Sequence, residues 1–210
     1  MASIYQLKSK FQDLLRPFCR SLARIGITAN QVTVFAMLLS IAFGALLTWA
    51  FIFIPENKLI LLGLPALLFV RMALNAIDGM LAREHGMKSH LGAFLNELGD
   101  VFSDVFLYLP FAVYGMRDFQ PVPWIALTVV LFVKMAIITE FMGVLSQATG
   151  SSRRYDGPMG KSDRAFWCSL LAIYLAFGGP DRPVVEIFFA LSALAALLTV
   201  LVRARKALSE

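Results

Sequence analysis

The residues best suited to chemistry lie between Asn75 and Asp104, where carboxylates, carboxamides and glycines interrupt an otherwise apolar sequence. In a helix, Asn75 and Asp78 lie one turn apart and project from one face. A second oxygen-rich face carries polar residues three or four positions apart: Asn96, Glu97, Asp100 and Asp104. Ionisable groups in a membrane span cost several kcal/mol unless they are paired or face a wet cavity. The cluster therefore indicates a functional site.

The chemistry of this cluster is that of a hard cation. Carboxylate and carboxamide oxygens, with no histidine or cysteine among them, favour Mg²⁺ or Mn²⁺ over zinc or iron. Mg²⁺ in turn implies a phosphate substrate. Gly79 and Gly92 allow a ligand to approach the backbone closely, and Arg83, one turn from Gly79, is suited to pair with a phosphate.

Helix packing is the simpler alternative for part of this stretch. Small residues at helix contacts are normal in membrane bundles, and packing alone accounts for Gly79, Ala82 and Gly92. Packing does not require several acids in so small a volume, namely Asp78, Glu97, Asp100 and Asp104.

Composition defines the elements that must position these residues. The chain has 210 residues, of which 59% are hydrophobic and 16% charged, and its mean hydropathy is +0.72. These values predict an all-α integral membrane protein. Six apolar stretches are long enough to span a bilayer: 28–54, 59–82, 92–116, 122–148, 164–179 and 183–202. Residues 26–206 are thus predicted to form one six-helix membrane domain, in which the short link between spans two and three makes them antiparallel neighbours.

Residues 1–25 predict an amphipathic helix lying at the membrane interface. Apolar residues recur there at helical spacing, with basic residues between them, which suits an anionic membrane surface. Pro17 is expected to kink or divide this helix.

The distribution of basic residues predicts the orientation. With the N-terminus in the cytoplasm, that side also receives most loop arginines and lysines, whereas the opposite loops hold only Lys58, Arg117 and Arg182. The positive-inside rule then places both termini and the polar cluster on the cytoplasmic side. The net charge of +5 follows from this asymmetry and from contact with anionic lipids, and no nucleic-acid-binding motif is present.

The polar stretch resembles the signature of the CDP-alcohol phosphatidyltransferase family, D-x2-D-G-x2-A-R-x8-G-x3-D-x3-D. The residues in register are Asp78, Gly79, Ala82, Arg83, Gly92 and Asp100. Residues 26–33 also resemble the family's entry to its first span. Asn75 and Asn96 stand where the family has aspartates, and Glu97 and Asp104 lie within a turn of these positions.

The resemblance implies a six-span homodimer in a bacterial inner membrane, with its site open to the cytoplasm. It also implies attack of an acceptor hydroxyl on CDP-diacylglycerol with release of CMP, using one or two Mg²⁺ or Mn²⁺ ions. The implied metal ligands are Asn75, Asp78, Asn96 and Asp100, with Glu97 and Asp104 as further candidates. Cytidine and phosphates would contact Asp78, Gly79, Ala82, Arg83 and Gly92. Asp100 has the register of the general base, with Asp104 as its rival.

Other charged residues leave alternatives open. Arg71 is expected to form a structural ion pair with Glu97, Asp104 or Glu140 rather than to contact substrate. Lys134 and Glu140 either line an acceptor pocket together or play a structural part. The loop around residues 150–164 is either a solvated positive-inside loop or an anion site made by basic residues: Arg153, Arg154, Lys161 and Arg164.

Three other functions compete with phosphatidyl transfer. The first is transfer of a phospho-head group from a soluble CDP-alcohol to diacylglycerol. The second is binding of lipid nucleotides without catalysis, which the two asparagines favour. The third is cation transport, since acids between helices also mark ion paths. The sequence does not identify the acceptor alcohol.

Overall fold

The computed structural model describes residues 4–115, 124–179 and 182–210, and all regular structure in these ranges is helical. In chain order the elements are α1 (Ile4–Arg24), α2 (Ala29–Phe53), the 3-10 helix η1 (Lys58–Leu62), α3 (Gly63–Glu84), α4 (His90–Tyr108), α5 (Pro110–Gly115), α6 (Trp124–Ala148), α7 (Lys161–Ala176) and α8 (Arg182–Leu208). Arg117, one of the residues used to predict orientation, lies outside the described ranges.

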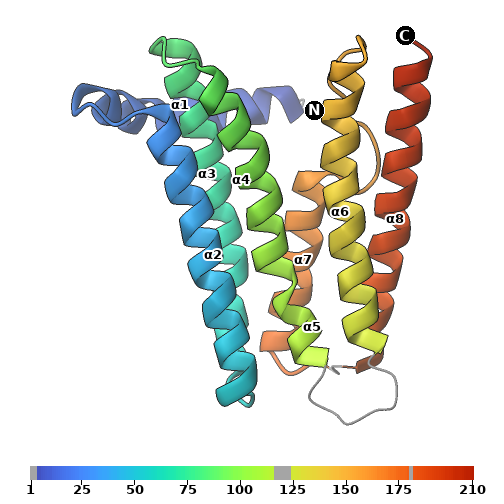
Figure 1. Cartoon of the computed structure of the whole chain (residues 1–210). Helices are drawn as coiled ribbons and strands as arrows, with labels where there is room; N and C mark the ends of the chain where they lie inside the picture. The colour runs from blue at the N-terminus through green and yellow to red at the C-terminus, as the bar shows by residue number, and fades with distance from the viewer. Residues whose placement is uncertain (1–3, 116–123, 180–181) are drawn as a thin grey trace.

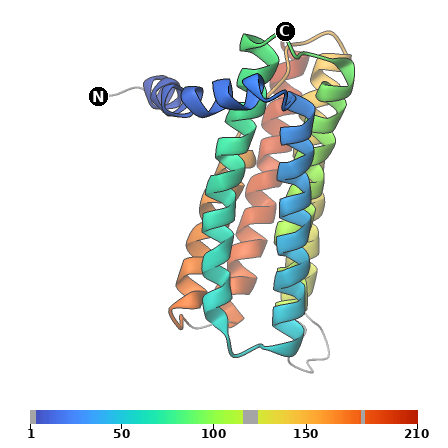
Figure 2. The ribbon, with the colours of Figure 1, turned by 90° about the vertical axis from the view of Figure 1, so that its left-hand side faces the viewer.

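The helices α2–α4 and α6–α8 run lengthwise in one bundle, and α1 runs crosswise at one end of it (Figures 1 and 2). The connection from α3 to α4 and the C-terminus lie at this same end. We refer to it as the α1 end. The polar cluster predicted from the sequence lies toward it.

Four helical segments are long and apolar enough to cross a membrane: Ala29–Phe53, Lys58–Glu84, Trp124–Ala148 and Pro183–Leu208. The remaining two predicted spans are weaker by these measures. α4 has 19 residues and carries three acids, and α7 has only 16 residues. Both lie in the bundle (Figure 1), and their crossing of the membrane stays a prediction.

α1 is one continuous helix, so Pro17 does not divide it. It is tied to the end of α3, because Arg16 donates from Nε and Nη2 to the two carboxylate oxygens of Glu84, both at 3.1 Å. The apolar face of α1 packs on a small buried cluster contributed by α2 and α3. Its location at a membrane interface remains a prediction.

α2 organises the half of the bundle that holds the signature residues, because it packs against both α3 and α4. It begins with a capping box: Gln31 N donates to Thr28 Oγ1 at 3.3 Å, and Thr28 N donates to Gln31 Oε1 at 2.8 Å. Gly44 allows close approach to α4, since a Cβ there would lie 2.1 Å from the carbonyl oxygen of Phe106. α2 thus braces the two helices that carry the signature.

The apolar core lies toward the other end of the bundle. Phe132 and Phe189, on α6 and α8, have ring centroids 5.5 Å apart, and Tyr108 and Phe111 pack against them at 5.7 and 5.4 Å. This aromatic cluster fixes α4–α6 and α8 by apolar contact. Toward the α1 end the interior becomes polar instead.

Candidate functional site

A cavity of about 380 Å³ opens between the N-terminal part of α2, the last turns of α3 and the first turns of α4. The signature contributes six residues to its wall: Asp78, Gly79, Ala82, Arg83, Gly92 and Asn96. The structure therefore brings the two halves of the signature together, and α2 supplies a third wall with Ala29, Asn30 and Thr33. Its size is in the range of small-molecule sites.

Asp78 is the buried acid of this cavity, with 6% of its surface exposed. Thr33 on α2 donates a hydrogen bond from Oγ1 to Asp78 Oδ2 at 2.8 Å. No lysine or arginine in the described ranges forms an ion pair with Asp78. Thr33 was not predicted as a site residue. The signal for it was the polar spacing of Asn30, Thr33 and Ser40 on an otherwise apolar helix.

The start of α4 shapes the cavity floor. Ser89 caps the helix, since its Oγ accepts a hydrogen bond from Gly92 N at 2.9 Å. Asn30 donates to the same Oγ from Nδ2 at 3.4 Å. A methyl group at Gly92 would lie 2.7 Å from Asn30 Oδ1, so a side chain here would have to displace the Asn30 carboxamide.

Arg71 links α3 to α4 below the cavity. Its Nη1 donates to Asp104 Oδ1 at 2.8 Å, and its Nη2 donates to the backbone oxygen of Asp100 at 3.2 Å and to Oδ1 at 3.3 Å. The structural ion pair predicted for Arg71 is confirmed: of its three expected partners Asp104 is the one found, and Asp100 is an additional partner. The arginine holds the two helices in register across the site.

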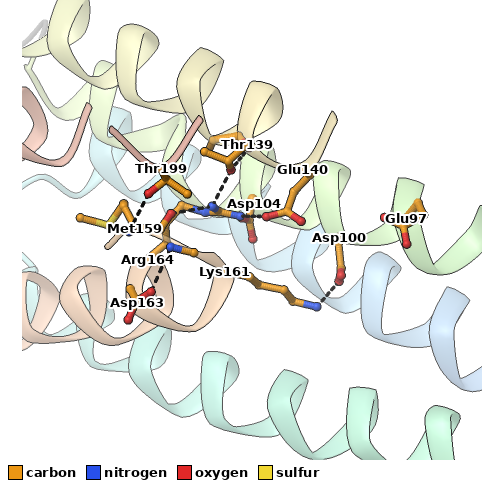
Figure 3. Close-up of polar contacts among 12 residues, drawn as sticks. Glu97, Asp100, Asp104, Thr139, Glu140, Met159, Lys161, Asp163, Arg164 and Thr199 are labelled. Carbon is orange, nitrogen blue, oxygen red and sulfur yellow. Dashed lines mark hydrogen bonds and ion pairs between the residues drawn. The ribbon is translucent and has the colours of Figure 1, made fainter. Parts of the chain in front are cut away.

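Arg164 reaches the same acid from the opposite side. Its Nε donates to Asp104 Oδ2 at 2.9 Å, its Nη2 to Glu140 Oε1 at 2.8 Å, and its Nη1 to Thr139 Oγ1 at 3.0 Å (Figure 3). Arg164 lies in the first turn of α7 and is only 1% exposed. Its predicted place in a solvated or anion-binding loop is therefore wrong. The missed signal was its position four residues before Cys168, on the buried face of α7.

Two basic residues from the loop and from the first turn of α7 meet the remaining acids of α4. Arg153 Nη2 donates to Glu97 Oε2 at 2.8 Å, and Lys161 Nζ forms an ion pair with Asp100 (Figure 3). Asp78 lies within electrostatic reach of both Asp100 and Lys161. Asp100 is accordingly part of the same site, although it does not line the cavity itself.

Arg154 turns away from this site and holds the loop against the end of α8. It contacts Asp156 at 2.8 Å and forms a second ion pair with Glu210. Lys206 on α8 hydrogen-bonds Asp156 and holds the pKa of that carboxyl below its ordinary value. The pKa of Glu210 is also lowered, first by the backbone N–H of Ser152, which donates at 2.8 Å. We call these contacts the loop clasp.

Lys134 and Glu140 do not share an environment. Lys134 is exposed on α6, whereas Glu140 is buried beside Arg164. They do not line a pocket together, and Glu140 has a structural partner.

The oxygen donors of the signature helices fit a hard divalent cation, with Asp78 and Asn96 lining the cavity and Asn75 and Asp100 outside its lining. The signature helices offer the carboxylates of Asp78 and Asp100 with the carboxamides of Asn75 and Asn96, and Asp78 is a buried acid without a cation. Within the described residues, no three His, Cys, Asp or Glu side chains are already arranged as a metal site. A metal would thus rely on the carboxamides or on rearranged acids.

The chain is similar to several known proteins, some of which are named as lipid synthases. A relative 45% identical is the inner membrane protein YnbA of Escherichia coli, with 82% of each chain covered. The phosphatidylinositol phosphate synthase of Mycobacterium tuberculosis is 29% identical over 71% of this chain and 64% of its own length. The archaetidylinositol phosphate synthase of Pyrococcus horikoshii is 32% identical over about half of either chain, 53% and 54%.

Solved structures of the mycobacterial synthase share the fold. The manganese and citrate complex has a TM-score of 0.74, with 21% identity, 91% of this chain and 87% of that chain covered. The structure with CDP-diacylglycerol bound has the same TM-score, with 19% identity and coverage of 91% and 92%.

A family model gives the same assignment as the signature residues that line the cavity. The family model described as CDP-alcohol phosphatidyltransferase matches residues 26–202, which is most of the chain. The chain is a membrane protein that belongs to the CDP-alcohol phosphatidyltransferase family.

Proposed function

We propose that this protein transfers a phosphatidyl group from CDP-diacylglycerol to an alcohol, with Mg²⁺ or Mn²⁺ as cofactor. The observation that carries the proposal is the cavity whose wall unites Asp78, Gly79, Arg83 and Gly92 from two helices. Support comes from the relatives named phosphatidylinositol phosphate synthases and from the similar fold with CDP-diacylglycerol bound.

In this reaction the acceptor oxygen bonds to the phosphorus that carries diacylglycerol, and the bond from this phosphorus to CMP breaks. CMP leaves, and the hydroxyl proton passes to Asp100, the acid at the base position. Arg83 at the cavity rim would bind the phosphates, and Gly79 and Gly92 leave room for cytidine. The protein mainly positions the reactants and neutralises charge.

A bound divalent ion would neutralise the diphosphate and polarise its oxygens. Asn75, Asp78, Asn96 and Asp100 are the residues proposed to hold it. Asp104 is less suited to metal or to base chemistry, because arginines occupy both of its oxygens. Arg153 and Lys161 remain candidates for contact with an anionic acceptor, whereas Arg154 is proposed to hold the loop.

The direct test is release of CMP from CDP-diacylglycerol by the purified protein in detergent, with Mg²⁺ or Mn²⁺ and a panel of alcohols and phosphorylated alcohols. We expect release that depends on both metal and acceptor and that disappears in Asp78→Asn. CDP-choline or CDP-ethanolamine with diacylglycerol tests the reverse arrangement, transfer of a phospho-head group. Turnover only with these soluble nucleotides would overturn the proposal in favour of that alternative.

A second candidate is supported by the ion pairs of Glu97 and Asp100 with basic side chains. These pairs occupy Asp100, the proposed base, and Glu97, a further candidate metal ligand, as expected of a protein that binds a lipid nucleotide without turning it over. Saturable CDP-diacylglycerol binding with no CMP release across the whole acceptor panel would favour this function.

A further inference from the structure

The acids around the site are matched by fixed basic side chains. Asp104 lies between Arg71 and Arg164, Glu140 contacts Arg164, and Glu97 contacts Arg153. Asp78 is the exception among the described acids of the site.

Lys161 and Arg71 both contact the signature carboxylate Asp100, and Lys161 is the more exposed of the two. Its ammonium forms an ion pair with Asp100, and Asp78 lies within electrostatic reach of the same ammonium. The lysine is the first residue of α7, and its side chain is 31% exposed, compared with 14% for Asp100. Lys161 therefore lies at the surface of the site, at the start of α7, and is not part of the buried core.

Charge decides how many divalent ions such a site can hold. Ligand charge is a main determinant of affinity for hard cations, and opposite charges a few ångströms apart interact by several kcal/mol near a protein surface. Here two of the proposed oxygen ligands are neutral carboxamides, Asn75 and Asn96. Asp100 already faces the ammonium of Lys161 and, at 3.3 Å, a guanidinium nitrogen that Arg71 supplies while it also pairs with Asp104. The fixed negative charge left for metal is centred on Asp78.

We propose that Lys161 acts as a built-in cation on Asp100 in place of a second divalent ion, so that the site binds one divalent ion, centred on Asp78. This inference rests on the proposed metal-dependent function. The two carboxamides and the lysine then act together: the carboxamides lower the negative charge of the site, and the lysine supplies a positive charge that a second metal ion would otherwise bring.

The test is the stoichiometry of Mn²⁺ binding, measured by the electron paramagnetic resonance signal of free Mn²⁺ during titration of the detergent-solubilised protein without nucleotide. We expect about one tightly bound ion per chain in the wild type and in Asn75→Asp/Asn96→Asp. Adding Lys161→Met to these two substitutions should raise the number to about two, whereas adding Lys161→Arg should leave it at about one. Two ions in Asn75→Asp/Asn96→Asp with Lys161 in place would overturn the proposal, as would one ion in the triple variant with Met.

A single substitution gives a second measurement if the multiple variants fold poorly. Lys161→Met alone should tighten Mn²⁺ binding roughly tenfold, because it removes a repelling charge beside the ligands. Lys206→Met is the matched control, since it removes a lysine from an acid in the loop clasp and should leave Mn²⁺ affinity unchanged. Equal Mn²⁺ affinity in Lys161→Met and wild type contradicts the inference.

Neither readout uses turnover. Failure to release CMP would therefore defeat the proposed function while leaving the binding stoichiometry to be judged by itself.

Discussion

Asp100 and Asp104 are one turn apart on α4, yet their surroundings assign them different parts. Asp104 is 4% exposed, and guanidinium groups of Arg71 and Arg164 contact both its oxygens. Asp100 is more exposed, and its partners are Lys161 at the start of α7 and Arg71 Nη2 at 3.3 Å. Asp100 is thus the more accessible of the two acids to a substrate.

Substituting each acid by asparagine separates these parts. Asp104→Asn leaves two buried arginines short of charge, and we expect a loss of about 3–5 kcal/mol in unfolding free energy. Asp100→Asn should keep the wild-type unfolding temperature while CMP release falls about 10²- to 10⁴-fold. Thermal unfolding in detergent and the CMP assay measure the two effects. A stable but inactive Asp104→Asn protein would identify Asp104 as the base instead.

The close contact between α2 and α4 depends on Gly44, which has no side chain. A Cβ at Gly44 would lie 2.1 Å from a backbone oxygen of α4, which no rotamer change can relieve. Gly44→Ala should therefore lower the unfolding free energy by roughly 1–3 kcal/mol or more, measured as a lower unfolding temperature.

Gly99→Ala is the matched control at the same interface. A Cβ there would lie 3.7 Å from Thr33 Cγ2, which is ordinary van der Waals contact. This variant should unfold at nearly the wild-type temperature. Equal destabilisation by both substitutions would mean that close approach at Gly44 is not what matters.

The loop clasp should be sensitive to acid. The pKa values of Asp156 and Glu210 are lower in the folded protein than their ordinary values of 3.8 and 4.5. A carboxyl with a depressed pKa stabilises the fold above its unfolded pKa, and this contribution is lost as pH falls through the folded value. Amide hydrogen exchange in residues 150–157, corrected for intrinsic rates, should stay slow from pH 7 to about 5 and accelerate below about pH 4.

The charge-neutral variant Asp156→Asn/Glu210→Gln provides the comparison. It should show fast exchange in residues 150–157 already at pH 7, because neutral side chains pair less strongly with Arg154 and Lys206. Exchange that is slow in this variant, or independent of pH in the wild type, would show that the ion pairs do not hold the loop.

At the scale of the whole molecule, the C-terminus lies at the α1 end (Figure 1). The cavity is lined by the start of α2, the end of α3 and the start of α4, which lie toward the same end. The positive-inside rule predicts that this end faces the cytoplasm. This orientation can be tested with single cysteines at Glu56 and Ser209. Both residues are exposed. Glu56 follows the end of α2, and Ser209 follows the end of α8, which lies at the opposite end of the bundle. Both native cysteines are buried.

In intact bacterial cells, a membrane-impermeant maleimide should label Glu56→Cys but reach Ser209→Cys only after the membrane is opened. The reverse pattern would invert the predicted orientation and would place the cavity on the far side of the membrane.

The sequence by itself determined the membrane class, the helical fold and the family, because these depend on local quantities. Hydropathy over some 20 residues marks a span, and the fixed register from Asp78 to Asp100 identifies the signature. Membership holds across residues 26–202. The placement of Gly79, Ala82 and Arg83 beside one cavity also follows the spacing, because residues three or four apart share one face of a helix.

Only the tertiary structure decided which charged groups meet. Arg164, Arg71 and Lys161 reach Asp104 and Asp100 from sequence positions 29 to 61 residues away, and no local pattern encodes such partners. Their pairing depends on how α7 and α3 pack beside α4, which is set by the whole bundle. For this reason the sequence could nominate both Asp100 and Asp104, whereas the fold buries Asp104 between two arginines and leaves Asp100 partly exposed beside Lys161 and one nitrogen of Arg71.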